Sequence, residues 1–170
     1  WDRISPDLTT NDPEKQKQEQ SGGVTVDNSA AEMHTTIYSI SESPVAAGTI
    51  WVGSNNGLIH LTKDEGKHWT NVSIAGLPRP ERANVSAIEA SPFDAGTAYV
   101  AIESLRLGDH RPHLFRTRDF GASWTEINEG LPVDEVSGSI TRVIRADPKR
   151  RGLLFVGTES GVRVSFDDGD

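Results

Sequence analysis

Residues Thr62 to Trp69 read TKDEGKHW, residues Thr117 to Trp124 read TRDFGASW, and Ser165 to Asp170 repeat the same start as SFDDGD. All three follow the pattern Ser/Thr-x-Asp-x-Gly, and in the first two a Trp comes three residues after the Gly. The Asp carboxylate can accept backbone N–H groups of the turn that it begins, and glycine suits a position with positive φ. The Trp adds a large apolar side chain with an N–H donor. Each copy therefore predicts a tight β-hairpin.

A partial fourth copy opens the sequence. Trp1 begins WDRIS, which has the pattern of WTNVS after the first hairpin and of WTEIN after the second. We expect the motif residues to act structurally rather than chemically; they are Thr62, Asp64, Gly66, Trp69, Thr117, Asp119, Gly121, Trp124, Ser165, Asp167, Gly169 and Trp1.

The sequence in front of each hairpin repeats as well. A turn, an apolar strand, a second turn and a third strand recur in 43–62, 91–104 and 147–165, and the motif aspartates are 55 and 48 residues apart. Short, evenly spaced strands between Gly, Pro and Asp turns predict one four-stranded antiparallel blade per repeat, hence an all-β propeller. In the first unit the strands are expected around 36–40, 49–53, 58–62 and 68–73.

The hairpin pattern is the signature of the Asp-box, and the chain resembles the BNR/Asp-box propellers, which include sialidases, xyloglucanase-type hydrolases and the sortilin (Vps10) ectodomain. It looks most like bacterial proteins labelled glycosyl hydrolase with BNR repeats, through the phrases WDRISPDLTTNDP, DNSAAEMHTTIYSISESP and DPKRRGLLFVGTESGVRVSFDDG. The resemblance covers essentially the whole chain and implies a secreted or periplasmic protein. It implies no particular reaction, because enzymes and non-enzymes share the hairpin.

We expect one partial propeller over residues 1–170. Three blades are fewer than the four or more of a closed propeller, so the blade faces and strand edges need a partner. The expected partner is the remainder of a longer propeller or another copy of the chain. The predicted parts are an outer strand of a preceding blade (1–4), a long loop (5–33), two blades (34–75 and 84–128) and a blade without its outer strand (140–170).

Composition narrows the classes of function. The net charge is −8 and no Lys/Arg-dense face is visible, which argues against a nucleic-acid partner. No apolar run approaches the roughly 18 residues of a membrane-spanning helix. The chain has no cysteine, so disulfides and thiolate metal sites are excluded. We expect no cofactor and no metal site.

One face of the predicted propeller concentrates the irregular loops. Connections from strand 2 to strand 3, and from strand 4 to the next strand 1, emerge opposite the hairpins. The segment 5–33 and the insertion Leu105–His113 (LRLGDHRPH) therefore share that face, where functional loops cluster on a rigid scaffold. Candidate binding residues there are Glu103, Asp109, His110, Arg111, His113, Arg79 and Arg82.

The same face carries carboxylates and histidines that are candidates for catalytic chemistry. Glycoside hydrolysis uses two carboxylates, about 5–5.5 Å apart for retention or about 6.5–9.5 Å apart for inversion. A sialidase site does not fit, because the two tyrosines, Tyr38 and Tyr99, lie inside predicted strands. His110 and His113 lack a third metal ligand at suitable spacing. The loop carboxylates on the predicted face are Glu32, Glu81, Glu103, Asp109, Asp134, Glu135 and Glu159.

Two classes of function stay open. The chain is either a non-catalytic propeller segment that binds protein or glycan, or scaffolds other domains, or a fragment of a sialidase- or xyloglucanase-like Asp-box hydrolase whose carboxylate pair lies partly outside it. Carbohydrate sites use exposed aromatic rings. The four tryptophans are assigned to hairpins or, for Trp51, to a strand, which favours the binding or scaffold role.

Overall fold

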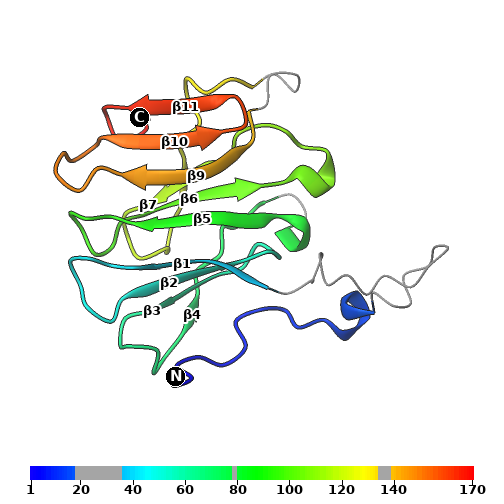
Figure 1. Cartoon of the computed structure of the whole chain (residues 1–170). Coiled ribbons are helices and arrows are strands. Elements are labelled where there is room, and N and C mark those ends of the chain that lie inside the picture. Colours follow the sequence, from blue (N-terminus) through cyan, green and yellow to red (C-terminus); the bar gives the residue numbers. More distant parts are fainter. Residues whose placement is uncertain (18–35, 78–79, 134–138) are drawn as a thin grey trace.

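A computed structural model describes residues 1–17, 36–77, 80–133 and 139–170. Its strands form three antiparallel sheets, which we call the first, second and third blades (Figure 1). The first blade contains β1 (Ile37–Glu42), β2 (Ile50–Ser54), β3 (Ile59–Thr62) and β4 (Thr70–Asn71). The second contains β5 (Asn84–Ala90), β6 (Ala98–Glu103), β7 (Leu114–Thr117) and β8 (Thr125–Glu126). The third contains β9 (Thr141–Ala146), β10 (Leu154–Thr158) and β11 (Gly161–Ser165).

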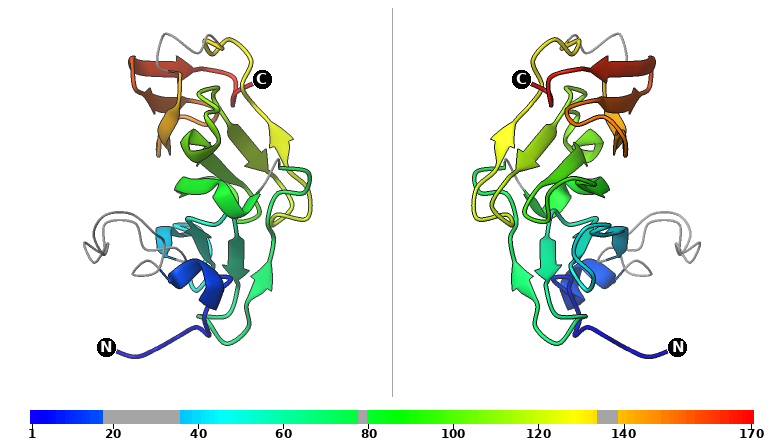
Figure 2. Two further views of the ribbon diagram at one scale, coloured as in Figure 1. Left: turned by 90° about the vertical axis from the view of Figure 1, so that its right-hand side faces the viewer. Right: turned by 90° about the vertical axis from the view of Figure 1, so that its left-hand side faces the viewer.

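Each blade is a meander in which strands adjacent in sequence pair with each other. The first strands β1, β5 and β9 lie side by side, while β4 and β8 form outer edges (Figure 2). Helical structure in the described residues is limited to the 3-10 turns η1 (Pro13–Gln16), η3 (Pro80–Arg82) and η4 (Leu105–Leu107). The prediction of an all-β fold with four-stranded antiparallel blades, the third without its outer strand, is confirmed.

Residues 1–4, expected as the outer strand of a preceding blade, pair with no described strand. That pairing requires inner strands from another blade and stays a prediction. The expected long loop is described only over residues 5–17, where it contains η1 and the buried Leu8. Residues 18–33 of that loop lie outside the described residues.

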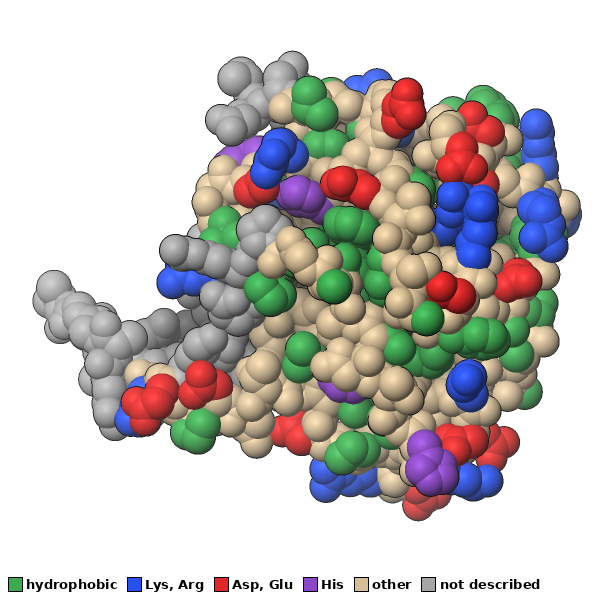
Figure 3. Space-filling model, turned by 180° about the vertical axis from the view of Figure 1, so that it is seen from behind, with side chains coloured by type: hydrophobic (Ala, Val, Ile, Leu, Met, Phe, Trp, Pro, Cys, Tyr) green, Lys and Arg blue, Asp and Glu red, His purple; other side chains and the backbone are tan. Residues whose placement is uncertain are grey.

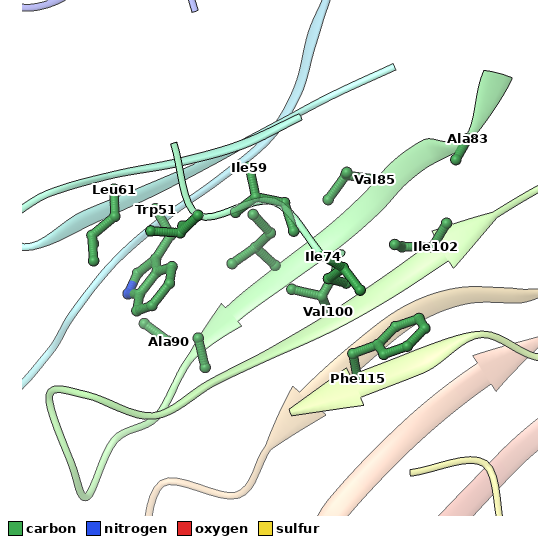
Figure 4. Packing of buried hydrophobic residues seen from close by; sticks show 13 residues of the cluster. Trp51, Ile59, Leu61, Ile74, Ala83, Val85, Ala90, Val100, Ile102 and Phe115 are labelled. Carbon is green, nitrogen blue, oxygen red and sulfur yellow. The ribbon is translucent and has the colours of Figure 1, made fainter. Parts of the chain in front are cut away.

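Two apolar cores hold the blades together, because each sheet buries one row of side chains against the next. The core between the first and second blades contains the fully buried Trp51 (Figure 4). The ring of Trp51 meets that of Trp124 edge to face, with 6.2 Å between the ring centroids. Burying a side chain of this kind stabilises the fold by about 1.5–3 kcal/mol. The core between the second and third blades includes Ala87, Tyr99, Ala101, Leu114, Ile127, Ile144, Leu154 and Val156.

The three motif hairpins share one hydrogen-bond pattern. In the second, the Thr117 hydroxyl donates to Asp119 Oδ1 at 2.8 Å and accepts the Gly121 N–H at 2.9 Å. Asp119 Oδ1 also accepts the Ser123 N–H at 2.8 Å. The first hairpin repeats these bonds, and the third repeats those from the hydroxyl. The sequence assigned the turn N–H groups to the Asp alone, whereas the Ser/Thr hydroxyl holds the glycine.

Candidate functional site

The loops separate onto two faces, as the sequence predicted. The hairpin turns lie on the left of Figure 1, whereas η4 and the turn between β10 and β11 lie on the right. We call the right-hand side the loop face. Acidic, basic and histidine side chains gather on it near the β6–β7 connection, at the upper left of Figure 3.

Asp109 organises the β6–β7 connection. Its carboxylate accepts hydrogen bonds from the backbone N–H of Arg111 at 3.1 Å, from Arg111 Nε at 2.9 Å and from Arg111 Nη2 at 2.6 Å. His113 Nε2 lies 3.1 Å from the same carboxylate. The Arg111 side chain, followed by other hydrogen bonds in the loop, holds the pKa of Asp109 well below its usual range. Asp109 therefore stays ionised at neutral pH and fixes the loop rather than carrying a proton.

Glu103 and Glu159 lie at matching places in successive blades, where β6 and β10 end. Both bind the same cation: Arg142 Nη1 donates to Glu103, and Arg142 Nη2 donates to Glu159 at 2.7 Å. Hydrogen bonds to Glu159 first, and then to Glu103, raise the pKa of the Arg142 guanidinium. Sequence reasoning found the two carboxylates but missed Arg142, which lies inside β9 and shows no loop signal.

The other predicted residues of this face are more dispersed. The carbonyl of His110 accepts a hydrogen bond from Ser139 Oγ at 2.7 Å, and Arg82 is exposed at the end of η3. Among the described residues, no three His, Asp or Glu side chains are grouped to hold a metal ion, and no helix has the length and apolarity to cross a membrane. Outside the described residues lie Arg79, Glu32, Asp134 and Glu135, together with the side chain of Glu81.

A groove of about 590 Å³ lies beside β11, between the second and third blades. Its lining mixes apolar and polar side chains, and the adjacent edge of β11 exposes Val162 and Val164. The sequence predicted a missing outer strand in this blade but did not identify the groove. The apolar residues that line it from the two blades include Ile127, Leu131, Leu154 and Val156.

A cluster of charges joins the second and third blades at the hairpin face. The side chain of Arg116 is 5% exposed, and its guanidinium donates to Asp168 Oδ2 at 3.1 Å and to Asp170 Oδ1 at 2.8 Å. Arg118 Nη2 donates to Asp168 at 2.8 Å, and the Tyr99 hydroxyl also contacts Asp168. Burial and the hydrogen bond to Asp168 raise the pKa of Tyr99. Asp168 and Asp170 of the third hairpin thus also bind side chains of the neighbouring second blade.

No protein-family model matches the sequence, and no curated protein sequence matches it. Solved structures do match. YCF48 bound to D1 peptide gives a TM-score of 0.57 at 21% identity, covering 79% of this chain and 38% of that one. YCF48 from Cyanidioschyzon merolae gives 0.58 at 21% identity, covering 80% and 38%. The GH74 xyloglucanase from Xanthomonas campestris gives 0.61 at 16% identity, covering 78% and 20%.

These likenesses concern the fold. Since YCF48 and the GH74 enzymes are β-propeller proteins, they confirm the propeller prediction. The chain spans about two fifths of the YCF48 structures and about one fifth of the xyloglucanase.

Proposed function

We propose that this chain is a non-catalytic propeller segment of the BNR/Asp-box type, which binds a protein or glycan partner through its loop face. One observation carries the proposal: Glu103 and Glu159 share Arg142. A glycosidase general acid must carry a proton near the working pH. One guanidinium holds an oxygen of each carboxylate, an arrangement that fits a structural ion-pair bridge between blades rather than an acid/base pair.

The construction of the loop face suits recognition. Asp109 binds Arg111 and His113 together, which gives the β6–β7 connection a defined shape before any partner arrives. A pre-organised loop loses less conformational entropy on binding. YCF48 bound to D1 peptide gives a precedent for peptide binding by a protein of this fold. The mixed charges of Arg111, Arg142 and Glu159 suit a polar partner.

The second candidate is a fragment of an Asp-box glycoside hydrolase. The likeness to the GH74 xyloglucanase favours it, with a TM-score of 0.61. In that case the carboxylate pair would lie partly outside this chain. By resemblance to the Asp-box proteins, we further propose that the protein is secreted or periplasmic.

Two assays separate the candidates. In the first, the chain is incubated with xyloglucan and with a fluorogenic sialoside, and no release above the blank is expected. Release that disappears in Glu103→Gln or Glu159→Gln would overturn the proposal. In the second, the chain is applied to arrays of glycans and of overlapping peptides, where binding is expected.

The variant Arg111→Ala should lose array binding, because it removes the main partner of Asp109. Arg151→Ala on the hairpin face is the matched control, and it should bind as the unchanged chain does. Binding that both substitutions reduce equally, or that neither reduces, would contradict a site on the loop face.

A further inference from the structure

The turn between the first two strands of every blade lies on the same side as the hairpins, and its three copies share one geometry (Figure 1). In the third blade this is the β9–β10 turn. There the Asp147 N–H donates to the carbonyl of Leu153 at 2.9 Å, and the Leu153 N–H donates to that of Arg150 at 3.3 Å. The turns at 43–49 and 91–97 repeat both bonds. The backbone of this turn is therefore set by the repeat.

The side chains at the centre of the turn are not set by the repeat. The sequence there is Val-Ala-Ala at 45–47, Phe-Asp-Ala at 93–95 and Lys-Arg-Arg at 149–151. Three consecutive cations thus occupy positions where the same turn forms equally well with none. Folding of the turn does not account for this charge, and a charged loop on a rigid scaffold is a place where recognition residues occur.

The exposure of the turn does not depend on where the third blade ends. Lys149, Arg150 and Arg151 are all exposed, and basic side chains gather on this side of the molecule at the right of Figure 3. The first and second blades are each followed by another blade, and their copies of the turn stay exposed: Val45 is 50% exposed, and Asp94 is exposed. A following blade therefore packs beside this turn without covering its tip.

The cations are oriented but not neutralised. The guanidinium of Arg150 lies over the ring of Phe166, with Cζ 5.2 Å from the ring centroid. That of Arg151 lies over the ring of Phe93 in the same way, at 5.0 Å. A guanidinium stacked on a ring directs its N–H groups sideways, in the geometry that binds a carboxylate. Among the described residues, no carboxylate forms an ion pair with either arginine or with Lys149.

Asp147 stiffens the turn from within. Its Oδ1 accepts the N–H groups of Lys149 and Arg150, both at 2.8 Å, and these bonds hold the pKa of Asp147 below its usual range. Three cations and this one carboxylate give the turn a local charge of +2, although the whole chain carries −8. The distant carboxylates act weakly on it, because charges more than about 8 Å away are largely screened at physiological ionic strength.

The neighbouring tips disfavour a broad anionic surface as the partner. Arg151 Nη2 donates to the carbonyl of Phe93 at 3.2 Å, so the β9–β10 turn touches the β5–β6 turn, which exposes Asp94. The third hairpin exposes Asp167 and Asp170 on the same side. A flat anionic membrane would meet these carboxylates together with the cations, and like charges across an interface are unfavourable. A slender chain contacts the β9–β10 turn alone.

The spacing of the three cations favours a peptide. Consecutive Cα atoms are about 3.8 Å apart, so the cations form a short, dense row, and a run of Asp or Glu residues has the same spacing. A uronic acid polymer carries only one carboxylate on each sugar ring, so its charges are further apart than those of an acidic peptide.

We propose that the β9–β10 turn is a docking site for an acidic segment of a partner protein, a run of Asp or Glu residues. Arg150 and Arg151 bind its carboxylates, and Lys149 adds a third charge at the tip. The inference concerns the hairpin face and does not depend on the proposed loop-face function. Peptides with acidic runs are therefore left out of the loop-face array, in which Arg151→Ala is the control.

Fluorescence anisotropy with a labelled oligo-glutamate peptide tests the proposal. The unchanged chain should bind this peptide but not a labelled oligo-glutamine peptide, and added NaCl should weaken the binding because exposed charges are screened. The decisive variant combines Lys149→Val, Arg150→Ala and Arg151→Ala, which gives the third blade the turn sequence of the first. It should fold normally, as checked by circular dichroism, and bind about tenfold or more weakly.

Two single variants separate the turn from the charge of the whole face. Lys149→Ala should weaken binding by about two- to fivefold, whereas Lys67→Ala, at an exposed lysine of the first hairpin, should change it little. Equal losses in the two variants would show a response to net charge alone and would contradict a site at the turn. No binding of oligo-glutamate by the unchanged chain, or full binding by the triple variant, would overturn the proposal. Tighter binding of polygalacturonate than of oligo-glutamate would overturn the choice of a peptide.

Discussion

Arg116 of β7 and Asp168 of the third hairpin form an ion pair, with Nη1 and Oδ2 3.1 Å apart, where the second blade meets the third. The same two positions between the first and second blades hold Leu61 and Phe120, which belong to the apolar core there. Equivalent positions thus hold apolar side chains in the interface between the first and second blades and an ion pair in the interface between the second and third.

Substitution of Arg116 or Asp168 alone should therefore destabilise the fold. Substitution of both by the apolar residues of the first interface should be tolerated. Arg116→Leu leaves Asp168 without its main buried partner and should lower the free energy of unfolding by about 3 kcal/mol. Arg116→Leu combined with Asp168→Phe reproduces the first interface and should recover most of that loss. Urea unfolding of the single and double variants measures the coupling. If the two losses simply add, the two interfaces are not equivalent.

Trp124 should contribute to the free energy of unfolding in two separable ways, through the packing of its ring and through the hydrogen bond of its N–H. Trp124→Ala removes the ring from the Trp51 contact and should destabilise the chain by about 3 kcal/mol. Trp124→Phe keeps an aromatic ring but loses the hydrogen bond to Val72, which should cost about 1 kcal/mol. Thermal and urea unfolding give both values. Equal losses in the two variants would assign the whole effect to the hydrogen bond.

Gly121 should resist substitution for a steric as well as a conformational reason. Its φ is +80°, and a Cβ would come within 2.7 Å of Val72 Cβ. We expect Gly121→Ala to cost about 1–3 kcal/mol by strain and overpacking. Gly130 also has a positive φ, of +76°, but its added Cβ would meet open space. Gly130→Ala is therefore the control, and the difference between the two unfolding energies isolates the contact with Val72.

The hairpin aspartates should make the free energy of unfolding depend on pH in the acidic range. Hydrogen bonds from Ser123 first, and then from Thr117, lower the pKa of Asp119 below its ordinary 3.8. The folded state therefore binds this proton less tightly than the unfolded state does. The resulting stabilisation is present above about pH 3.8 and is lost as the pH falls toward the lowered pKa.

Asp119→Asn should flatten this part of the stability profile. The urea midpoint of the unchanged chain should fall between about pH 5 and pH 2, and the variant should fall less. Glu129→Gln, at an exposed carboxyl after β8, is the control. An identical pH profile for Asp119→Asn and the unchanged chain would show that other groups control acid unfolding.

The sequence predicted the fold well because its signals are local. The strands expected around 49–53 and 58–62 are observed at Ile50–Ser54 and Ile59–Thr62. The outer strand expected around 68–73 is shorter, Thr70–Asn71. Hairpin chemistry depends on residues two to five positions apart, and such spacing can be read directly from the chain.

The candidate site was less predictable because its contacts cross between blades. Asp109, Arg111 and His113 are close in sequence, and their grouping was expected. The Arg142 bridge joins residues 39 and 17 positions apart, so neither spacing nor composition could reveal it. The sequence also did not predict that Arg116 and Asp168 form an ion pair at the positions that Leu61 and Phe120 hold in the first interface, because that contact joins two blades as well.

The hydrogen bond from Trp124 to Val72 also gives the propeller a direction of assembly. Its acceptor is synthesised 52 residues before its donor. During translation, the exit of the first blade, the residues that follow β4, has therefore already been synthesised when the second hairpin leaves the ribosome, so the acceptor precedes the donor that binds it. If the blades fold in the order in which they are synthesised, the exit of each blade provides the docking contact for the hairpin of the next one.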